Sequence, residues 1–111
     1  MTGSPLSSKH CVPCEGGTKP LSPDDYGAFL RTLSGWNDTD QNKIEKIFKF
    51  KNFKEALVFI NKVGEIAETE QHHPDINLFS WNKVKLTLTT HAIKGLSEND
   101  FILAAKIEEI S

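Results

Sequence analysis

Residues 83–89 read Lys-Val-Lys-Leu-Thr-Leu-Thr, a stretch in which polar and apolar side chains alternate without a break. A period of two places Val84, Leu86 and Leu88 on one face of a β-strand and the lysines and threonines on the other. We therefore predict a strand that packs one face against a core. The opposite face must be solvated or form a site.

Further strands are predicted on the N-terminal side of this one. Residues 76–79 are expected to form a short strand, and residues 36–40 a connection or a short strand. Residues 43–50 alternate partially and are rich in aromatic side chains, with Phe48 and Phe50 on the same face.

Three helices are predicted from capping residues and apolar spacing. One runs from residue 22 to a stop at residue 35, one of about five turns starts at residue 52 and ends before Pro74, and one covers residues 97–110. The first opens with Ser-Pro-Asp-Asp, and the other two begin at patterns that resemble capping boxes. The apolar residues that recur at helical spacing in the second helix are Phe53, Leu57, Ile60, Val63, Gly64 and Ala67.

This order of elements predicts an α+β fold. Strands that are close in sequence favour antiparallel pairing, so we expect a two-layer sandwich of about four strands with helices packed on one face. Residues 1–20 are rich in Gly, Pro and Ser and are predicted to form a flexible arm. Residues 21–111 are predicted to form the single domain.

Composition excludes several classes of protein. A chain of 111 residues with a net charge of -2 has no strongly basic field, which argues against a dedicated nucleic-acid binder. The apolar runs are too short for a transmembrane helix, and we find no apolar stretch typical of a secretory signal near the start. We therefore expect a cytoplasmic protein without membrane contact.

The two cysteines form a Cys11-Val12-Pro13-Cys14 motif within the predicted arm. A zinc site needs four ligands, and His10 is the only further candidate nearby. A solvated or loosely packed tail is the favoured interpretation. Redox chemistry and a shared metal site are alternatives, and the absence of a secretion signal argues for reduced thiols.

Three of the four histidines, His72, His73 and His91, lie within a short window of the chain. His72 lies at the predicted end of the second helix, where the helix dipole and the nearby Glu68 both favour a protonated imidazole. Pro74 restricts the backbone of His73, so the adjacent rings should point in different directions. By strand parity, His91 lies on the face opposite the apolar one.

Several interpretations of these histidines stay open on residue chemistry alone. Each could be an exposed or satisfied side chain, or the three could ligate zinc together with Asp100. Asp100 could instead only cap the last helix, and Trp81 could be a core residue or stack on a planar heterocycle. The pattern favours acid–base chemistry on a small substrate, since no phosphate-binding glycine loop or covalent nucleophile is evident.

One combination of motifs resembles a known family. It comprises Glu68 to Pro74, Trp81 to Val84, Leu88 to His91, and Gly95-Leu96-Ser97 with Asp100. This combination is similar to the pterin-4a-carbinolamine dehydratases, and the similarity covers about residues 20–110. The Cys-Val-Pro-Cys arm is also similar to that of some plant, protist and bacterial relatives.

The resemblance implies dehydration of 4a-hydroxytetrahydropterin to quinonoid dihydropterin, in tetrahydrobiopterin recycling, without a metal or cofactor. It implies that His72 and His91 are the acid/base residues and that His73 binds substrate near the reacting carbon. It also implies that Glu68, Asp100 and Trp81 contribute to the substrate pocket. The family fold is an α+β sandwich with helices on one side of an antiparallel sheet.

The chain departs from the family pattern at a few positions. Gln71 stands where many relatives have Asp, Asn99 stands where many have a basic residue, and the segment from Pro74 to Trp81 is one residue longer than in animal members. These changes affect secondary contacts in the expected pocket rather than the histidines.

The resemblance also implies a homodimer or homotetramer. Some animal members act as dimerisation cofactors of a transcription factor, and distant relatives are linked to pterin binding or molybdopterin. These roles are the alternatives to the dehydratase.

Overall fold

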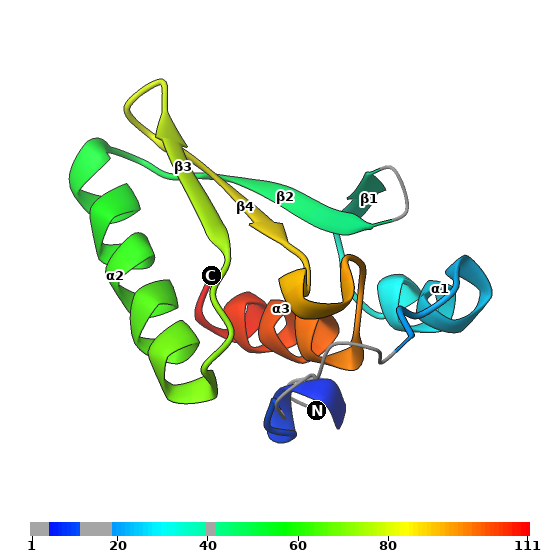
Figure 1. Ribbon diagram of the computed structural model, residues 1–111. Helices are drawn as coiled ribbons and strands as arrows, with labels where there is room; N and C mark the ends of the chain where they lie inside the picture. The colour runs from blue at the N-terminus through cyan, green and yellow to red at the C-terminus, as the bar shows by residue number, and fades with distance from the viewer. Residues whose placement is uncertain (1–4, 12–18, 40–41) are drawn as a thin grey trace.

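The computed structural model describes residues 5–11, 19–39 and 42–111 (Figure 1). Three α-helices, four strands and two short 3-10 helices follow one another along these residues. In chain order they are η1 (Pro5–Ser8), α1 (Pro23–Arg31), β1 (Asn37–Thr39), β2 (Lys43–Lys49), α2 (Phe53–Glu70), β3 (Asp75–Phe79), β4 (Lys83–Leu88), η2 (His91–Ile93) and α3 (Glu98–Ile110).

The four strands form one antiparallel sheet in the order β1-β2-β4-β3. In its centre Ile44 pairs with Leu88, and Val84 pairs with both Phe48 and Leu78. The three α-helices pack against one face of this sheet (Figure 1). The predicted α+β class and the antiparallel sheet covered on one face are therefore confirmed.

The core lies between β4 and α3. The side chains of Val84, Leu86 and Leu88 are completely buried, as strand alternation predicts, and so are Phe101 and Leu103 of α3. Ser22 and Asp25 form a reciprocal capping box at the start of α1, which confirms the predicted helix start. None of the helices within the described residues is long and apolar enough to cross a membrane.

The buried face of α2 differs from the one suggested by its large apolar residues. Phe53 and Leu57 are 49% and 40% exposed, whereas Ala56, Phe59, Val63, Ala67 and Glu70 are buried. On this buried face the aromatic ring of Phe59 packs on Phe48 and Phe50. The exposed residues form an apolar strip near the start of the helix.

The described part of the predicted arm, residues 5–11, is packed rather than extended. Leu6 is only 5% exposed and belongs to the main core, while Lys106 donates a hydrogen bond to the Ser7 carbonyl at 2.9 Å. Element η1 thus lies on α3, on the side away from the sheet (Figure 1). The average composition of residues 1–20 does not indicate that the side chain of Leu6 is buried in the core. Cys14 lies outside the described residues, and the domain boundary near residue 20 stays a prediction.

Candidate functional site

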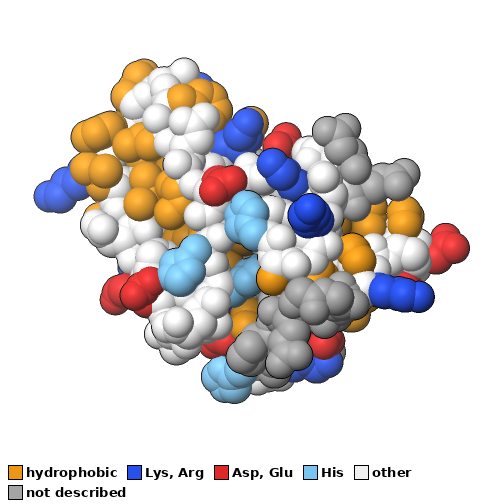
Figure 2. All heavy atoms as spheres, viewed as in Figure 1, with side chains coloured by type: hydrophobic (Ala, Val, Ile, Leu, Met, Phe, Trp, Pro, Cys, Tyr) orange, Lys and Arg blue, Asp and Glu red, His pale blue; other side chains and the backbone are white. Residues whose placement is uncertain are grey.

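A cavity of about 610 Å³ opens between the C-terminal end of α2, the β4–η2 connection and the start of α3. Its volume lies within the range of about 300–1,000 Å³ that is typical of small-molecule sites. Histidine side chains gather near the middle of the face shown in Figure 2. The lining residues are Cys11, Thr69, Glu70, Gln71, His72, His73, Thr89, Thr90, His91, Ala92 and Asn99.

The end of α2 places His72 in this cavity. Gln71 adopts a left-handed conformation (φ 56°), which terminates the helix and turns the chain toward α3. The Nε2 atom of His72 then lies 2.6 Å from Oδ1 of Asp100. The His72 side chain is only 12% exposed and that of Asp100 is fully buried, so this contact is shielded from water.

Asp100 uses its two oxygens for different tasks. Oδ2 accepts hydrogen bonds from the Thr90 hydroxyl at 2.8 Å and from the Ser97 backbone N–H at 3.0 Å. The second bond belongs to the predicted capping box of α3, while Oδ1 is left to hold His72. One carboxylate can therefore cap α3 and hold His72 at the same time.

His73 lines the same cavity with a different carboxylate partner. Its Nε2 lies 2.5 Å from Oε2 of Glu68, and both side chains are more than half exposed. We expected Glu68 to act on His72, one helical turn later. That expectation is wrong because the left-handed residue at 71 carries His72 away from the helix axis and toward Asp100. Glu68 therefore does not line the cavity itself, and its link to the site is its contact with His73.

His91 lines the cavity from a different element, the 3-10 helix η2. Strand β4 ends at Leu88, and His91 is the first residue of the 3-10 helix η2, so this turn rather than strand parity sets its position. The residue is exposed and lines the cavity. Within the described part of the chain its ring has no hydrogen-bonding partner, which leaves both nitrogens for a ligand.

The structure does not bring Trp81 to this cavity. Ser80 and Trp81 form the tight turn between β3 and β4, both with positive φ, and Trp81 is 61% exposed. The six residues of β4 separate this turn from the histidine end of the strand by about 20 Å. The pocket contact expected for Trp81 is therefore absent within this chain.

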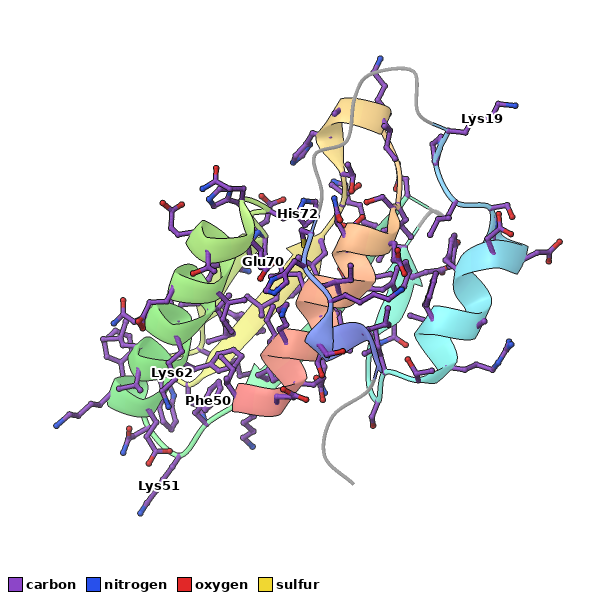
Figure 3. The ribbon with its side chains drawn as sticks, turned by 90° about the horizontal axis from the view of Figure 1, so that it is seen from below. Lys19, Phe50, Lys51, Lys62, Glu70 and His72 are labelled. Atoms are coloured by element: carbon purple, nitrogen blue, oxygen red, sulfur yellow. The ribbon has the colours of Figure 1, made fainter. Side chains whose placement is uncertain are left out.

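Two residues that sequence reasoning missed, Glu70 and Cys11, also line the cavity. Glu70 accepts hydrogen bonds from the Cys11 N–H at 2.7 Å and from His10 at 3.0 Å (Figure 3). Burial alone would raise the pKa of Glu70, but these bonds and the charge of Lys106 hold it below its ordinary value. Gln71 and Asn99, where the chain departs from the resembling family, lie in the cavity wall as well.

Imidazole side chains gather at the cavity, and carboxylates contact two of them. Among residues 5–11, 19–39 and 42–111, no cluster of His, Cys, Asp or Glu side chains could hold a metal ion. With Asp100 as a carboxylate, the proton of its hydrogen bond lies on Nε2 of His72, and Nδ1 is the nitrogen left for a substrate. An anchored imidazole therefore faces the same cavity as an unpartnered one, His91.

The chain is similar to a known family of proteins over most of its length. The family described as pterin 4 alpha carbinolamine dehydratase matches residues 19–110. A protein of this name from Rubrobacter xylanophilus is 46% identical over 107 residues, covering 96% of this chain and 99% of its own length. Another, from Alkaliphilus metalliredigens, is 50% identical over 105 residues and covers 94% of each chain.

A solved structure is similar as well. The crystal structure of a Brucella melitensis protein described as a transcriptional coactivator/pterin dehydratase superposes with a TM-score of 0.78 at 34% identity. The match covers 83% of the present chain and 98% of the other.

Proposed function

This chain belongs to the pterin-4a-carbinolamine dehydratase family, a family of hydro-lyases, and we propose that it dehydrates 4a-hydroxytetrahydropterin to quinonoid dihydropterin in pterin recycling. The observation that carries the proposal is the convergence of His72, His73 and His91 on one cavity. Asp100 holds the ring of His72 and Glu68 that of His73, whereas His91 has no hydrogen-bonding partner among the described residues.

The chemistry requires two proton movements. The 4a-hydroxyl group leaves as water after it receives a proton from a general acid, and the C4a–O bond breaks. The lone pair of the neighbouring ring nitrogen N5 forms the new C=N bond, and a general base removes the N5 proton. One proton is delivered and one is taken up, so the enzyme returns to its starting state after transfer between its groups or with solvent.

Imidazoles suit both movements because their charge changes close to neutral pH. In the proposed mechanism His72 and His91 act as the acid/base pair on opposite sides of the pterin. Asp100 fixes the tautomer and the orientation of His72, as a carboxylate does for an imidazole in other acid–base sites. Thr90 and Ser97 in turn hold Asp100, so we assign them a positioning role.

We assign substrate binding to His73, with Glu68 as the partner that orients its ring. Gln71 and Asn99 place neutral residues in the wall where the resemblance leads us to expect charged ones, and Gln71 donates to the Glu68 carbonyl at 2.9 Å. Trp81 is left out of the proposed site because it lies at the far end of the β3–β4 hairpin.

We further propose that the protein is a homo-oligomer. Phe53, Leu57 and Val58 on α2 are 40–49% exposed. Figure 2 shows hydrophobic side chains gathered on the side of the molecule where α2 lies. Strands β1 and β3 are the sheet edges and offer a second contact. Light scattering on the purified protein should give a mass of two or four times the 12.4 kDa of one chain. A monomer at micromolar concentration would contradict this proposal.

The Brucella relative is described as a transcriptional coactivator/pterin dehydratase, so a role as a transcriptional coactivator is a second candidate function. Such a role would use helix surfaces rather than the cavity. Binding to a transcription factor that persists in a His91→Ala variant, in a protein without dehydratase activity, would favour it.

The dehydratase proposal is tested by adding purified protein to 4a-hydroxytetrahydropterin generated in situ by a pterin-dependent hydroxylase. We expect faster decay of the carbinolamine than in buffer, with quinonoid dihydropterin as the product. A decay rate equal to that in buffer at micromolar protein would overturn the proposal, and pterin binding without turnover would favour a pterin-binding role instead.

A further inference from the structure

The N-terminal segment, residues 5–11, reaches the cavity from outside the α+β sandwich. It starts on α3, where Leu6 is buried in the core, and ends at Cys11, which lines the cavity. The Cys11 sulfur lies 3.6 Å from the carbonyl oxygen of Asn99, another lining residue. The segment therefore covers part of the cavity wall beside the start of α3.

Glu70 fixes the end of this segment. Its carboxylate, which is 7% exposed, accepts from the Cys11 backbone N–H through Oε1 and pairs with His10 through Oε2. Lys106 lies 3.7 Å from Oε2 and also donates to the Ser7 carbonyl, so one lysine bridges both ends of the contact. Buried charge-assisted bonds of this kind are stronger than neutral ones. Figure 3 shows Glu70 beside His72 at the end of α2.

The anchors of the histidines do not involve the segment. His72 is held by Asp100 and His73 by Glu68, and both contacts lie within α2, α3 and their connections. A shift of residues 5–11 would therefore change the shape of the cavity while it left these two pairs in place.

We propose that residues 5–11 form a substrate-binding wall of the pterin pocket and that Glu70 is the positioning residue that holds this wall. The inference rests on the proposed dehydratase function and assigns the segment to substrate affinity rather than to the proton transfers. It also gives Cys11 a role as a wall residue that sets the space available to the pterin.

The first test enlarges the wall residue. Cys11→Leu places a branched side chain at the cavity, and we expect KM to rise about fivefold or more while kcat changes less than about twofold, the signature of lost binding without lost chemistry. Arg31→Leu, at an exposed position of α1 outside the cavity, is the matched control and should leave both constants unchanged.

The second test loosens the wall through its anchor. Glu70→Gln removes the charge that receives the Cys11 and His10 bonds, whereas Glu65→Gln makes the same change at an exposed position of the same helix. We expect weaker binding of 7,8-dihydrobiopterin, measured by calorimetry, in the first variant only. Thermal unfolding of each variant verifies that it is folded, and Cys11→Ala replaces Cys11→Leu if the latter does not fold.

The outcomes separate the two proposals. An active wild-type enzyme with unchanged KM and dihydrobiopterin affinity in the Cys11 and Glu70 variants would overturn the wall and leave the dehydratase intact. A fall in kcat without a change in KM would also overturn it, because the segment would then act on the histidines. A wild-type protein without dehydratase activity would overturn both proposals.

Discussion

Asp100 connects the stability of α3 with the proposed chemistry at the scale of a single side chain. Asp100→Asn keeps an acceptor for the Ser97 N–H but removes the negative charge beside His72. Because an amide can also present its N–H₂ to the ring and disturb the tautomer, we expect kcat to fall about 10²-fold or more, with a small change in Tm.

Steady-state dehydration rates and thermal unfolding of the same samples check this prediction. Glu55→Gln is the control, since Glu55 is an exposed acid in the first turn of α2 and does not line the cavity. A kcat of Asp100→Asn within about twofold of wild type would contradict the role assigned to the His72–Asp100 pair.

Cys11 should be an unreactive thiol. Burial raises the pKa of Cys11 to about 12, and the nearby carboxylates of Glu70 and Asp100 act in the same direction. In a Cys14→Ser variant Cys11 is the only thiol of the chain, and iodoacetamide should modify it much more slowly at pH 7 than in urea, because the thiolate is the reactive form. Equal rates in the folded and unfolded protein would contradict the packing of this segment.

Residue chemistry predicted which side chains matter better than it predicted their partners. The three histidines and Asp100 were found from type and spacing, and all four are at or next to one cavity. Which carboxylate holds which imidazole depends on the left-handed conformation of Gln71, which the residue type does not specify. Trp81 was assigned from the motif alone, and the direction of β4 carries it away from the site.

At the scale of elements, the turn after η2 depends on a glycine. Gly95 pairs with Thr90, and a Cβ added to it would lie 2.6 Å from Cβ of Pro20. Gly95→Ala should therefore lower the free energy of unfolding by about 1–3 kcal/mol through overpacking. Gly64→Ala, in the middle of α2 with open space around the new methyl group, should raise it by about 0.5–1 kcal/mol.

Urea unfolding of the two alanine variants beside the wild type checks both signs. If Gly95→Ala were as stable as the wild type, the close approach of residues 19–21 to the η2 turn would be wrong.

The helix starts were predictable because capping residues are local signals, and the Ser22 N-cap and the Ser97 capping box are confirmed. At Asn52 the side chain accepts from the Glu55 N–H, which is one half of the box predicted there. The buried face of α2 was not predictable in the same way. The spacing of the large residues Phe53 and Leu57 indicated one face of the helix, whereas the buried face contains the small residue Ala56. A helical register that starts at Ala56 also passes through Ala67 and Glu70. An acid on this buried face is therefore the feature of the sequence from which Glu70 could have been predicted as a site residue.

At the scale of the whole molecule, the N-terminal segment couples stability to pH through Glu70. Its pKa is lower in the folded protein than its ordinary value of 4.5, so its contribution is complete at neutral pH. That contribution is lost as pH falls below about 4.5 and through the folded-state value. The stability advantage of the wild type over Glu70→Gln should therefore be largest near pH 7 and shrink toward pH 3.

Unfolding in urea across this range checks the prediction, with Glu65→Gln as the exposed control. An advantage that is constant or grows on acidification would contradict the attachment of residues 5–11 through an ionised Glu70.

The whole fold was predictable because strand alternation, caps and element order agree on one antiparallel sandwich. The cavity was less predictable than the fold, since it forms where α2, the β4–η2 connection, α3 and residues 5–11 meet. Those contacts span nearly the full length of the chain. Only the folded molecule brings such distant positions together.

The measurement that tests the central claim most directly is the decay of 4a-hydroxytetrahydropterin followed by stopped-flow absorbance with the wild type and with a His72→Ala, His91→Ala double variant. A double Lys83→Ala, Lys85→Ala variant on the open face of the sheet serves as the control. We predict that the wild type and the control accelerate the decay and that the double histidine variant loses most of this acceleration. A folded double histidine variant that is as fast as the wild type would contradict histidine acid–base catalysis in this cavity.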